Sequence, residues 1–396
     1  MFERVSKAPA DPILGLTDTF NADPRPEKVN LGVGVFRNED GLTPILRTVK
    51  IAEQRLLDSE TTKSYLAISG DAEYGRQVQL LLFGPEHNII SNQLARTAQT
   101  PGGTGALRVA ADFVARQLDV ETIWVSNPTW GNHNSIFASA SLSVKSYRYY
   151  DAETQSLDFD GMLEDLQQVR SSDVVVFHGC CHNPTGIDPT VEQWQQLAAL
   201  AEKVGFIVLF DFAYQGFAVG VDEDAAGLRI FAEKVPELLV ASSFSKNFGL
   251  YNERVGAFTL VASNRTVADD AFSQVKSIIR ANYSNPPAHG AKIVAAVLAD
   301  PDLKQQWIDE VREMREHIWT LRLSLVEKLH ALGVNRDFSF ITTQKGMFSY
   351  TGLTPEQVAR LREEFGIYMV GTGRINVAGL SSKNIDSVCR AIATVL

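Results

Sequence analysis

Cysteine is scarce in this 396-residue chain, and its three cysteines, Cys180, Cys181 and Cys389, do not form the pattern of a disulfide framework. An odd count with two adjacent residues favours a reducing compartment, so we expect a cytoplasmic protein. Positive charge is also in deficit, because 37 Lys and Arg face 47 Asp and Glu and leave a formal net charge of −10. That balance argues against binding of nucleic acid across a broad basic face.

Long hydrophobic runs are missing as well. No segment approaches the ~18 consecutive apolar residues that cross a membrane. The start of the chain, MFERVSKAPADPILGL, lacks the continuous apolar stretch of a secretory signal. Hydrophobic residues nevertheless make up 45% of the chain and charged residues 21%, which is typical of a folded globular protein. We therefore expect a soluble protein with no membrane partner.

The middle of the chain predicts an α/β fold. Short apolar runs alternate there with helical patterns such as Glu192–Val204, which Gly205 closes. The runs are Thr122–Val125, Val174–His178, Phe206–Phe210, Leu238–Ala241 and Val255–Val261. Strands that are apolar on both faces belong to a mainly parallel sheet with helices around it.

The C-terminal part predicts a second, smaller α+β domain, because 396 residues exceed the ~250–300 that one core supports. Apolar residues step by three or four from Leu303 to Leu329, which indicates one helix of about thirty residues. Shorter elements follow around a helix near Pro355–Phe365. We expect residues 1–43 to form an N-terminal arm and part of the small domain, with a Pro-rich stretch (PADPILGL) that packs onto another part. Residues 44–313 would be the large domain and 314–396 the small one.

A glycine-rich segment, Gln99–Arg108 (QTPGGTGALR), precedes a helical pattern. Small residues before a helix let backbone N–H groups approach an anion, and the helix dipole favours a phosphate there. A tight strand-to-helix turn explains the glycines equally well. The P-loop ending Gly-Lys-Ser/Thr is absent, which argues against nucleotide triphosphates.

Two further polar segments directly follow apolar strands, HGCCHNPTG at residues 178–186 and FDFAYQGF at residues 210–217. No second ligand pair with zinc spacing accompanies the His and Cys residues, so we expect no metal. Asn183 precedes a proline in a turn, and its amide would lie at the sheet edge. Asp211 ends a hydrophobic strand, where a carboxylate either meets a cation or caps a neighbouring helix.

Lys246 is the most suggestive lysine, because it follows an apolar strand within the segment SSFSKNFGLYNER. A lysine in a partly dry pocket has a lowered pKa and can act as an amine nucleophile, although a loop lysine is more often solvated. Arg254 could bind a phosphate in the same pocket. A strand-end Lys, a strand-end Asp, a glycine loop and an Arg together match what pyridoxal 5'-phosphate requires.

The sequence also resembles a known family, the fold-type I aminotransferases, in its aspartate and aromatic amino acid group. The resemblance runs from end to end through these segments: DPILGL, NLGVGV, TPGGTGALR, HGCCHNPTG, DFAYQGF, SSFSKNFGLYNERVG, RANYSNPPAHG, GMFSYTGL and GRINVAGL. It implies a fold-type I PLP-transferase with a mainly parallel seven-stranded sheet and helices on both faces. It also implies pyridoxal 5'-phosphate as cofactor, amino acids and 2-oxo acids as substrates, and a homodimer with shared active sites.

The resemblance assigns roles to individual residues. The implied catalytic residues are Lys246, which bonds to the cofactor and moves a proton, Asp211, which pairs with the pyridine nitrogen, and Tyr214. The implied cofactor-binding residues are these three together with Gly103, Thr104, Trp130, His133, Asn183, Ser243, Arg254 and the partner's Tyr65. The implied substrate-binding residues are Gly34, Trp130, Asn183, Arg280 across the dimer and Arg374. A core role for Trp130 and a purely structural buried His133 are the alternatives.

The resemblance implies reversible amino transfer between L-aspartate and 2-oxoglutarate. An aromatic amino acid aminotransferase is the alternative within the family. A non-catalytic binding protein is disfavoured, because binding alone needs neither Lys246 nor Asp211. A dehydrogenase is disfavoured because no G-x-G-x-x-G segment follows an early strand.

Overall fold

The computed structural model describes residues 1–7 and 14–396 and divides the chain into two compact units. The larger unit comprises Pro44–Asn183 and Ile187–Glu316, and the smaller unit comprises Met1–Thr43, Pro184–Gly186 and His317–Leu396. The predicted domain boundaries, after residues 43 and 313, stay a prediction. Most of the Pro-rich stretch expected to form a packing arm lies outside the described residues.

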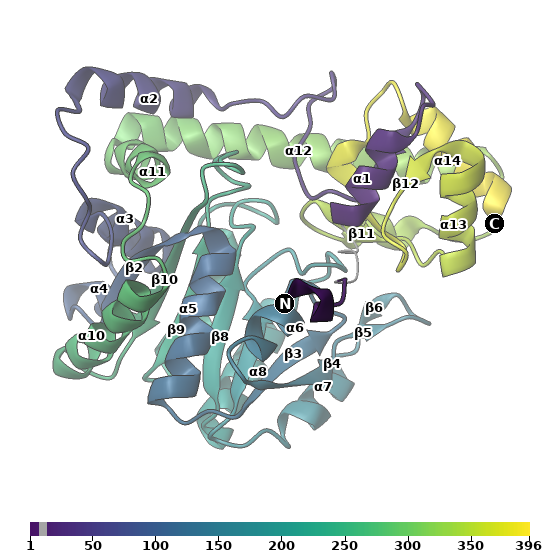
Figure 1. Cartoon of the computed structure of the whole chain (residues 1–396). Helices are drawn as coiled ribbons and strands as arrows, with labels where there is room; N and C mark the ends of the chain where they lie inside the picture. Colours follow the sequence, from purple (N-terminus) through teal and green to yellow (C-terminus); the bar gives the residue numbers. More distant parts are fainter. Residues whose placement is uncertain (8–13) are drawn as a thin grey trace. The chain divides into compact units, whose positions relative to one another are not determined.

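A seven-stranded sheet lies at the centre of the larger unit (Figure 1). Its order is β2 (Ala95–Pro101), β10 (Val255–Val261), β9 (Leu238–Ser243), β8 (Ile207–Phe212), β7 (Val174–His178), β3 (Thr122–Asn127) and β4 (Ser143–Arg148). The pairs from β4 to β9 are parallel, and β10 runs antiparallel to both β9 and β2. The predicted mainly parallel sheet is therefore confirmed.

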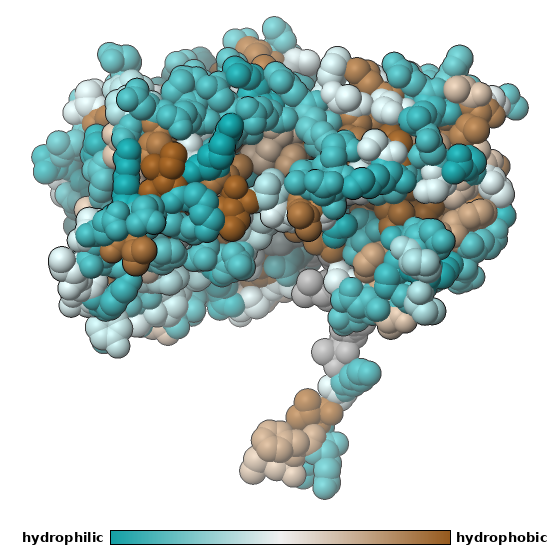
Figure 2. Space-filling view, turned by 90° about the horizontal axis from the view of Figure 1, so that it is seen from above, coloured by the Kyte–Doolittle hydropathy of each residue, from teal (hydrophilic) through white to brown (hydrophobic). Residues whose placement is uncertain are grey.

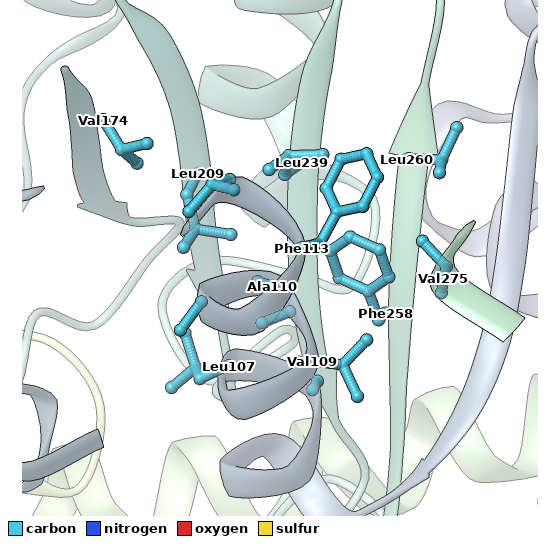
Figure 3. Close-up of a cluster of buried hydrophobic side chains, with 14 of the residues drawn as sticks. Leu107, Val109, Ala110, Phe113, Val174, Leu209, Leu239, Phe258, Leu260 and Val275 are labelled. Atoms are coloured by element: carbon cyan, nitrogen blue, oxygen red, sulfur yellow. The ribbon is translucent and has the colours of Figure 1, made fainter. Parts of the chain in front are cut away.

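Both faces of this sheet are covered, which explains why the strands are apolar on both sides. On one face, Phe113 of α5 (Gly102–Gln117) lies beside Phe258, Leu239 and Leu260 (Figure 3). On the other face, the ring of Phe177 lies 6.0 Å from that of Trp194 and 5.3 Å from that of Phe231, between ring centres. Trp194 belongs to α8 (Val191–Val204) and Phe231 to α9 (Ala226–Lys234).

Local sequence signals set the ends of the predicted helix in this region. Thr190 and Gln193 form a capping box at the start of α8. Gly205 ends it with φ 81°, a left-handed conformation that glycine adopts without steric cost. The remaining helices of the larger unit are α2 (Arg47–Ser59), α3 (Ala72–Phe83), α4 (Asn88–Ser91), α6 (Asn132–Ala138), α7 (Phe159–Leu166), α10 (Arg265–Asn282) and α11 (His289–Ala299).

The predicted long helix is α12 (Pro301–Ala331), and its apolar stripe is buried from Leu303 to Leu329. The smaller unit contains a parallel pair, β1 (Val29–Asn30) with β12 (Ile367–Tyr368), and an antiparallel pair, β11 (Phe348–Tyr350) with β13 (Arg374–Asn376). Its other helices are α1 (Leu14–Ala22), α13 (Pro355–Phe365) and α14 (Ile385–Val395). This mixture of short strands and helices is α+β, as the sequence predicts.

The surface carries many polar side chains. On the face drawn in Figure 2, hydrophilic residues predominate and hydrophobic atoms gather in separate patches. Within residues 1–7 and 14–396, no helix has the length and hydropathy to span a membrane. All three cysteines are buried, and no disulfide joins them.

Candidate active site

The central strands bring polar side chains together at one edge of the sheet. Because β7 and β8 are parallel, the residues that end them lie side by side, and His178 pairs with Asp211 in the ladder. Lys246 follows β9, the next strand along the sheet. Ligands bind in open α/β sheets at the carboxyl ends of the strands, where these residues are found.

Asp211 is the acidic centre of a buried hydrogen-bond chain. His133 Nε2 lies 3.0 Å from Asp211 Oδ2, and His133 Nδ1 lies 2.8 Å from Thr129 Oγ1. Thr129 Oγ1 also lies 3.2 Å from His178 Nε2. An ionised carboxylate only accepts hydrogen bonds, so Nε2 of His133 is the donor to Asp211. These hydrogen bonds thus fix the tautomer of the His133 imidazole.

The hydrogen bond and charges around Asp211 keep its carboxylate ionised. Burial by itself raises the pKa of Asp211, but the hydrogen bond from His133 and the charges of His133, His178 and Lys246 leave it below its ordinary value. Burial lowers the pKa of His178 to about 3, helped by the nearby His133. A buried anion beside a neutral His178 is suited to hold a protonated nitrogen of a ligand.

Lys246 is part-buried, and its Nζ lies 4.8 Å from the centre of the Tyr214 ring. Desolvation lowers the pKa of Lys246 to about 8; the Arg254 charge lowers it further and the Asp211 carboxylate opposes the shift. An amine with that pKa is still mostly protonated near physiological pH, but its neutral fraction is far larger than that of an ordinary lysine, so it can act as a nucleophile or a base.

At the glycine-rich turn between β2 and α5, which we call the phosphate cradle, neighbouring groups lie so close to the backbone that no side chain fits. Gly102 has φ 76°, and a Cβ there would lie 2.3 Å from Arg254 Nη2. A Cβ on Gly103 would lie 3.0 Å from Ser243 Cβ. Thr104 follows in the first turn of α5, whose N–H groups have no partner within the helix. A helix N-terminus beside a guanidinium and a hydroxyl suits a phosphate group.

These residues fit pyridoxal 5'-phosphate. The larger unit by itself provides an anion cradle, a carboxylate for a protonated ring nitrogen and an amine for an aldehyde. Trp130 lies in the same region, with its ring 5.4 Å from that of His133 in an edge-on arrangement. Asn183 is buried just beyond β7, in the turn that the sequence predicts.

Two predicted site residues of the larger unit lie apart from this group. Tyr65, between α2 and α3, is 92% exposed. Arg280 is exposed in the last turn of α10, where its guanidinium donates to Ser284 Oγ. Both side chains are accessible on the surface of this chain.

The smaller unit holds the other two predicted residues. Arg374 begins β13, is 4% exposed, and donates through Nη2 to Gly32 O at 2.6 Å. Its Cζ lies 4.2 Å from the centre of the Phe348 ring. A Cβ on Gly34 would lie 2.6 Å from Phe348 Cζ, so a larger residue there would displace the ring.

Sequence reasoning missed three residues of these clusters. Thr129 precedes His133 by four positions in SNPTWGNH, and only that spacing hinted that it reaches the imidazole. His178 ends a predicted strand but carried no predicted role. Phe348 looks like an ordinary core residue, and nothing local to it signals contact with Arg374.

A possible metal cluster within the described residues comprises Cys180, Cys181 and Asp224, whose ligand atoms lie within 4.8 Å of one another. The Asp224 carboxylate already accepts backbone N–H groups from the four loop residues Gly216, Ala218, Val219 and Gly220. Burial also raises the pKa of Cys180 well above its ordinary value. The cluster is therefore explained as the support of a loop.

The sequence model of one family, described as aminotransferase class I and II, matches residues 26–392. The chain belongs to the aminotransferase class I and II family. The prediction of an aminotransferase that depends on pyridoxal 5'-phosphate is thereby confirmed.

Individual members of this aminotransferase family are similar over the whole length. The aspartate aminotransferase of Escherichia coli strain K12 is 60% identical over 396 residues, which is 100% of each chain. The aromatic-amino-acid aminotransferase of Pseudomonas aeruginosa is 48% identical and covers 100% of this chain and 98% of its own. A crystal structure of an aromatic-amino-acid aminotransferase from Burkholderia pseudomallei, covalently bound to pyridoxal phosphate, has a TM-score of 0.98 at 49% identity. That match covers 100% of this chain and 99% of the other, which confirms the fold-type I architecture.

Proposed function

We propose that this aminotransferase transfers an amino group reversibly between L-aspartate and 2-oxoglutarate, giving oxaloacetate and L-glutamate. The observation that carries the proposal is the 60% identity, over the full length of both chains, to an aspartate aminotransferase. The buried pair of Asp211 and His133 supports it, because mere binding needs no such charged group.

Bound pyridoxal 5'-phosphate supplies an electron sink for the charge that develops at the substrate Cα. Asp211 keeps a proton on the ring nitrogen, and His133 holds the carboxylate in place from behind. Lys246 would hold the cofactor through its amine and would move the proton at the substrate Cα. A pKa of about 8 suits Lys246 to this task, since a neutral amine accepts the proton readily.

The other cofactor contacts in this proposal are those that the resemblance to the family implies. Gly103, Thr104, Ser243 and Arg254 bind the phosphate, with Tyr65 of the partner subunit. Asn183 and Tyr214 would donate hydrogen bonds to the cofactor, and Trp130 would cover its ring. A homodimer is part of this proposal, because the exposed Tyr65 acts on the partner's site.

Two arginines recognise the dicarboxylic substrate. Arg374 binds the α-carboxylate and Arg280 of the partner subunit binds the distal one, since a planar guanidinium matches a carboxylate with two parallel hydrogen bonds. The resemblance also assigns Gly34, Trp130 and Asn183 to substrate binding. We place the enzyme in the cytoplasm, because its three buried thiols suit a reducing compartment.

Aromatic amino acid transfer is the second candidate. It is favoured by the TM-score of 0.98 and 49% identity to an aromatic-amino-acid aminotransferase. The two candidates differ in how much the distal carboxylate contributes, because an aromatic side chain offers Arg280 no charge.

Steady-state rates with aspartate, glutamate, tyrosine and phenylalanine on one preparation distinguish the candidates. We expect kcat/KM to be highest with aspartate or glutamate. A higher value with tyrosine or phenylalanine would establish the aromatic activity instead. Borohydride reduction followed by peptide mapping tests the site itself, and a pyridoxyl group on a lysine other than Lys246 would contradict the assignment.

A further inference from the structure

Arg322 of α12 is a buried arginine in the smaller unit, with only 1% of its surface exposed. Such burial is rare for this residue type and requires that the guanidinium be hydrogen-bonded. Nη2 donates to Gly346 O at 2.7 Å and to Phe348 O at 2.6 Å, and Nη1 donates to Ile341 O at 3.3 Å and to Ser349 Oγ. The guanidinium thus binds the start of β11 at several points.

The two faces of β11 have different neighbours. Side chains alternate along a strand, so Ser349 points to the face that meets Arg322 while Phe348 and Tyr350 point to the other. In the β11–β13 ladder Tyr350 pairs with Arg374. Phe348 is therefore the diagonal neighbour of Arg374 on the same face, which explains the 4.2 Å separation of guanidinium and ring.

The tip of the Phe348 ring meets the segment around Gly34, where a Cβ would lie 2.6 Å from Cζ. Asn376 fixes that segment by donating from Nδ2 to Val33 O at 2.7 Å and Val35 O at 2.8 Å. The ring therefore contacts both the Arg374 guanidinium and the backbone near Gly34. A shift of β11 relative to α12 would move the ring against both.

We propose that Arg322 is a positioning residue: by anchoring the backbone of Phe348 it places the ring that orients Arg374, and so controls affinity for the substrate carboxylate. The inference deepens the proposed function and rests on the role of Arg374 stated there. A guanidinium over an aromatic face is attracted by the ring quadrupole. A clamp with two parallel hydrogen bonds also loses affinity when its plane tilts.

The holoenzyme variant Arg322→Lys tests this, because lysine keeps the charge but lacks the planar fork that reaches several carbonyl groups. Succinate, a dicarboxylate without an amino group, measures carboxylate affinity independently of turnover. We expect its Kd and the KM for aspartate to rise about tenfold, the equivalent of one hydrogen bond. The kcat should change less than about threefold, since Lys246 and Asp211 are untouched.

Arg25→Met is the matched control in the same unit. Arg25 also donates to backbone carbonyl groups, those of Arg362 and Glu363, but it does not contact β11. Arg25→Met should lower the melting temperature of the enzyme without changing the Kd of succinate. If Arg322→Lys behaves in the same way, Arg322 is only structural and the proposal is wrong.

A double-mutant cycle tests whether Arg322 acts through the ring. Phe348→Leu alone should weaken succinate binding, and adding Arg322→Lys should weaken it little further. If the double variant instead raised the Kd of succinate by the product of the two single factors, Arg322 would not act through Phe348.

Ser349→Ala removes one hydrogen-bond partner and keeps the arginine, so it tests the proposal even if Arg322→Lys fails to fold. It should raise the Kd in the same direction by a smaller factor, and an unchanged Kd would count against the proposal.

Arg374→Lys separates failure of this inference from failure of the proposed function. If Arg374→Lys leaves the Kd of succinate unchanged, the assignment of Arg374 as the carboxylate clamp is wrong. If Arg374→Lys weakens succinate binding while Arg322→Lys and Ser349→Ala do not, Arg374 still binds the carboxylate, but Arg322 does not position it.

Discussion

Asp211 and Lys246 show how their surroundings separate the protonation states of two nearby residues. The pKa of Asp211 lies below its ordinary value despite burial, because His133 donates to it. The pKa of Lys246 falls to about 8 because its amine is desolvated. An ionised acid and a readily neutral amine therefore coexist at one site, which is what proton transfer at a substrate carbon requires.

The first prediction concerns the titration of Lys246 in cofactor-free protein. The folded state binds the proton of Lys246 less well than the unfolded chain does. The contribution of this group to the free energy of unfolding therefore falls as the pH drops from about 10.5 to about 8, and it stays constant at lower pH. Acylation of Lys246, followed by peptide mapping, should rise with a midpoint near pH 8. Asp211→Asn removes a charge that raises this pKa, so the midpoint should move lower. A midpoint near 10.5 would contradict the desolvation argument.

The second prediction concerns Asp211→Ala. A charge-assisted hydrogen bond is worth roughly 1.5–3 kcal/mol, or about ten- to a hundredfold in rate. The loss in kcat should exceed that range, because the ring nitrogen then loses its proton in the transition state itself. Asp173→Ala is the control, since Asp173 is 1% exposed and pairs with Arg170 just before β7. It should lower stability and leave kcat near the original value. A largely active Asp211→Ala enzyme would argue against the pyridinium role.

At the level of single elements, the turn from β2 into α5 illustrates how close packing of backbone creates an anion site. Gly102 requires a positive φ, and its hydrogen atoms leave space that Arg254 Nη2 occupies. Gly256 of β10 approaches the same turn, where a Cβ would lie 2.3 Å from the carbonyl carbon of Gly102. A side chain at Gly102 or Gly256 would fit only if the turn moved away from Arg254 or from β10.

The third prediction is that Gly102→Ala weakens binding of pyridoxal 5'-phosphate much more than binding of pyridoxal. The methyl group would strain the backbone by ~1 kcal/mol or more and displace Arg254 from the phosphate. Fluorescence titration of the cofactor-free protein with both compounds measures the difference. Gly131→Ala is the matched control, because Gly131 also lies at the N-terminus of a helix but has nothing within 4 Å of its Cβ position. Equal loss with both compounds would show that the cradle does not bind the phosphate.

At the scale of the whole molecule, the exposed Arg280 and Tyr65 are the features that a single chain does not explain. An exposed ion pair of Arg280 would contribute only ~0–1 kcal/mol. If Arg280 binds a desolvated carboxylate in the partner's site, its truncation should cost ~2–5 kcal/mol with aspartate and much less with phenylalanine.

The fourth prediction follows from that two-chain geometry. Homodimers of Lys246→Ala and of Arg280→Ala should each be nearly inactive towards aspartate. A mixed dimer contains one doubly damaged site and one intact site, so co-refolding the two variants should restore up to half of the original activity per mixed dimer. Verified mixed dimers without recovered activity would show that Arg280 does not act across the interface.

The sequence by itself determined the central strands and the long helix, and it predicted the residues of the cofactor site. Continuous apolar runs such as Val174–His178 and Val255–Val261 coincide with β7 and β10, because strands covered on both faces have no polar side to obscure them. The edge strands β2 and β4 carry polar residues such as Arg96 and Lys145 and gave no such signal. Asp211 was recognisable because it directly follows the apolar run Phe206–Phe210, and Lys246 because it lies shortly after the run Leu238–Ala241.

Only the tertiary structure decided which side chains support those residues. Arg322 is four residues after Ile318 and three before Leu325, at the edge of the apolar stripe, but nothing in the sequence indicates which groups its guanidinium meets. Thr129 and Phe348 likewise gain their roles from partners 49 and 26 positions away. Periodicity and local motifs report which face of an element is buried, whereas the choice of partner depends on how distant segments pack. A single sequence does not encode that packing in any local pattern.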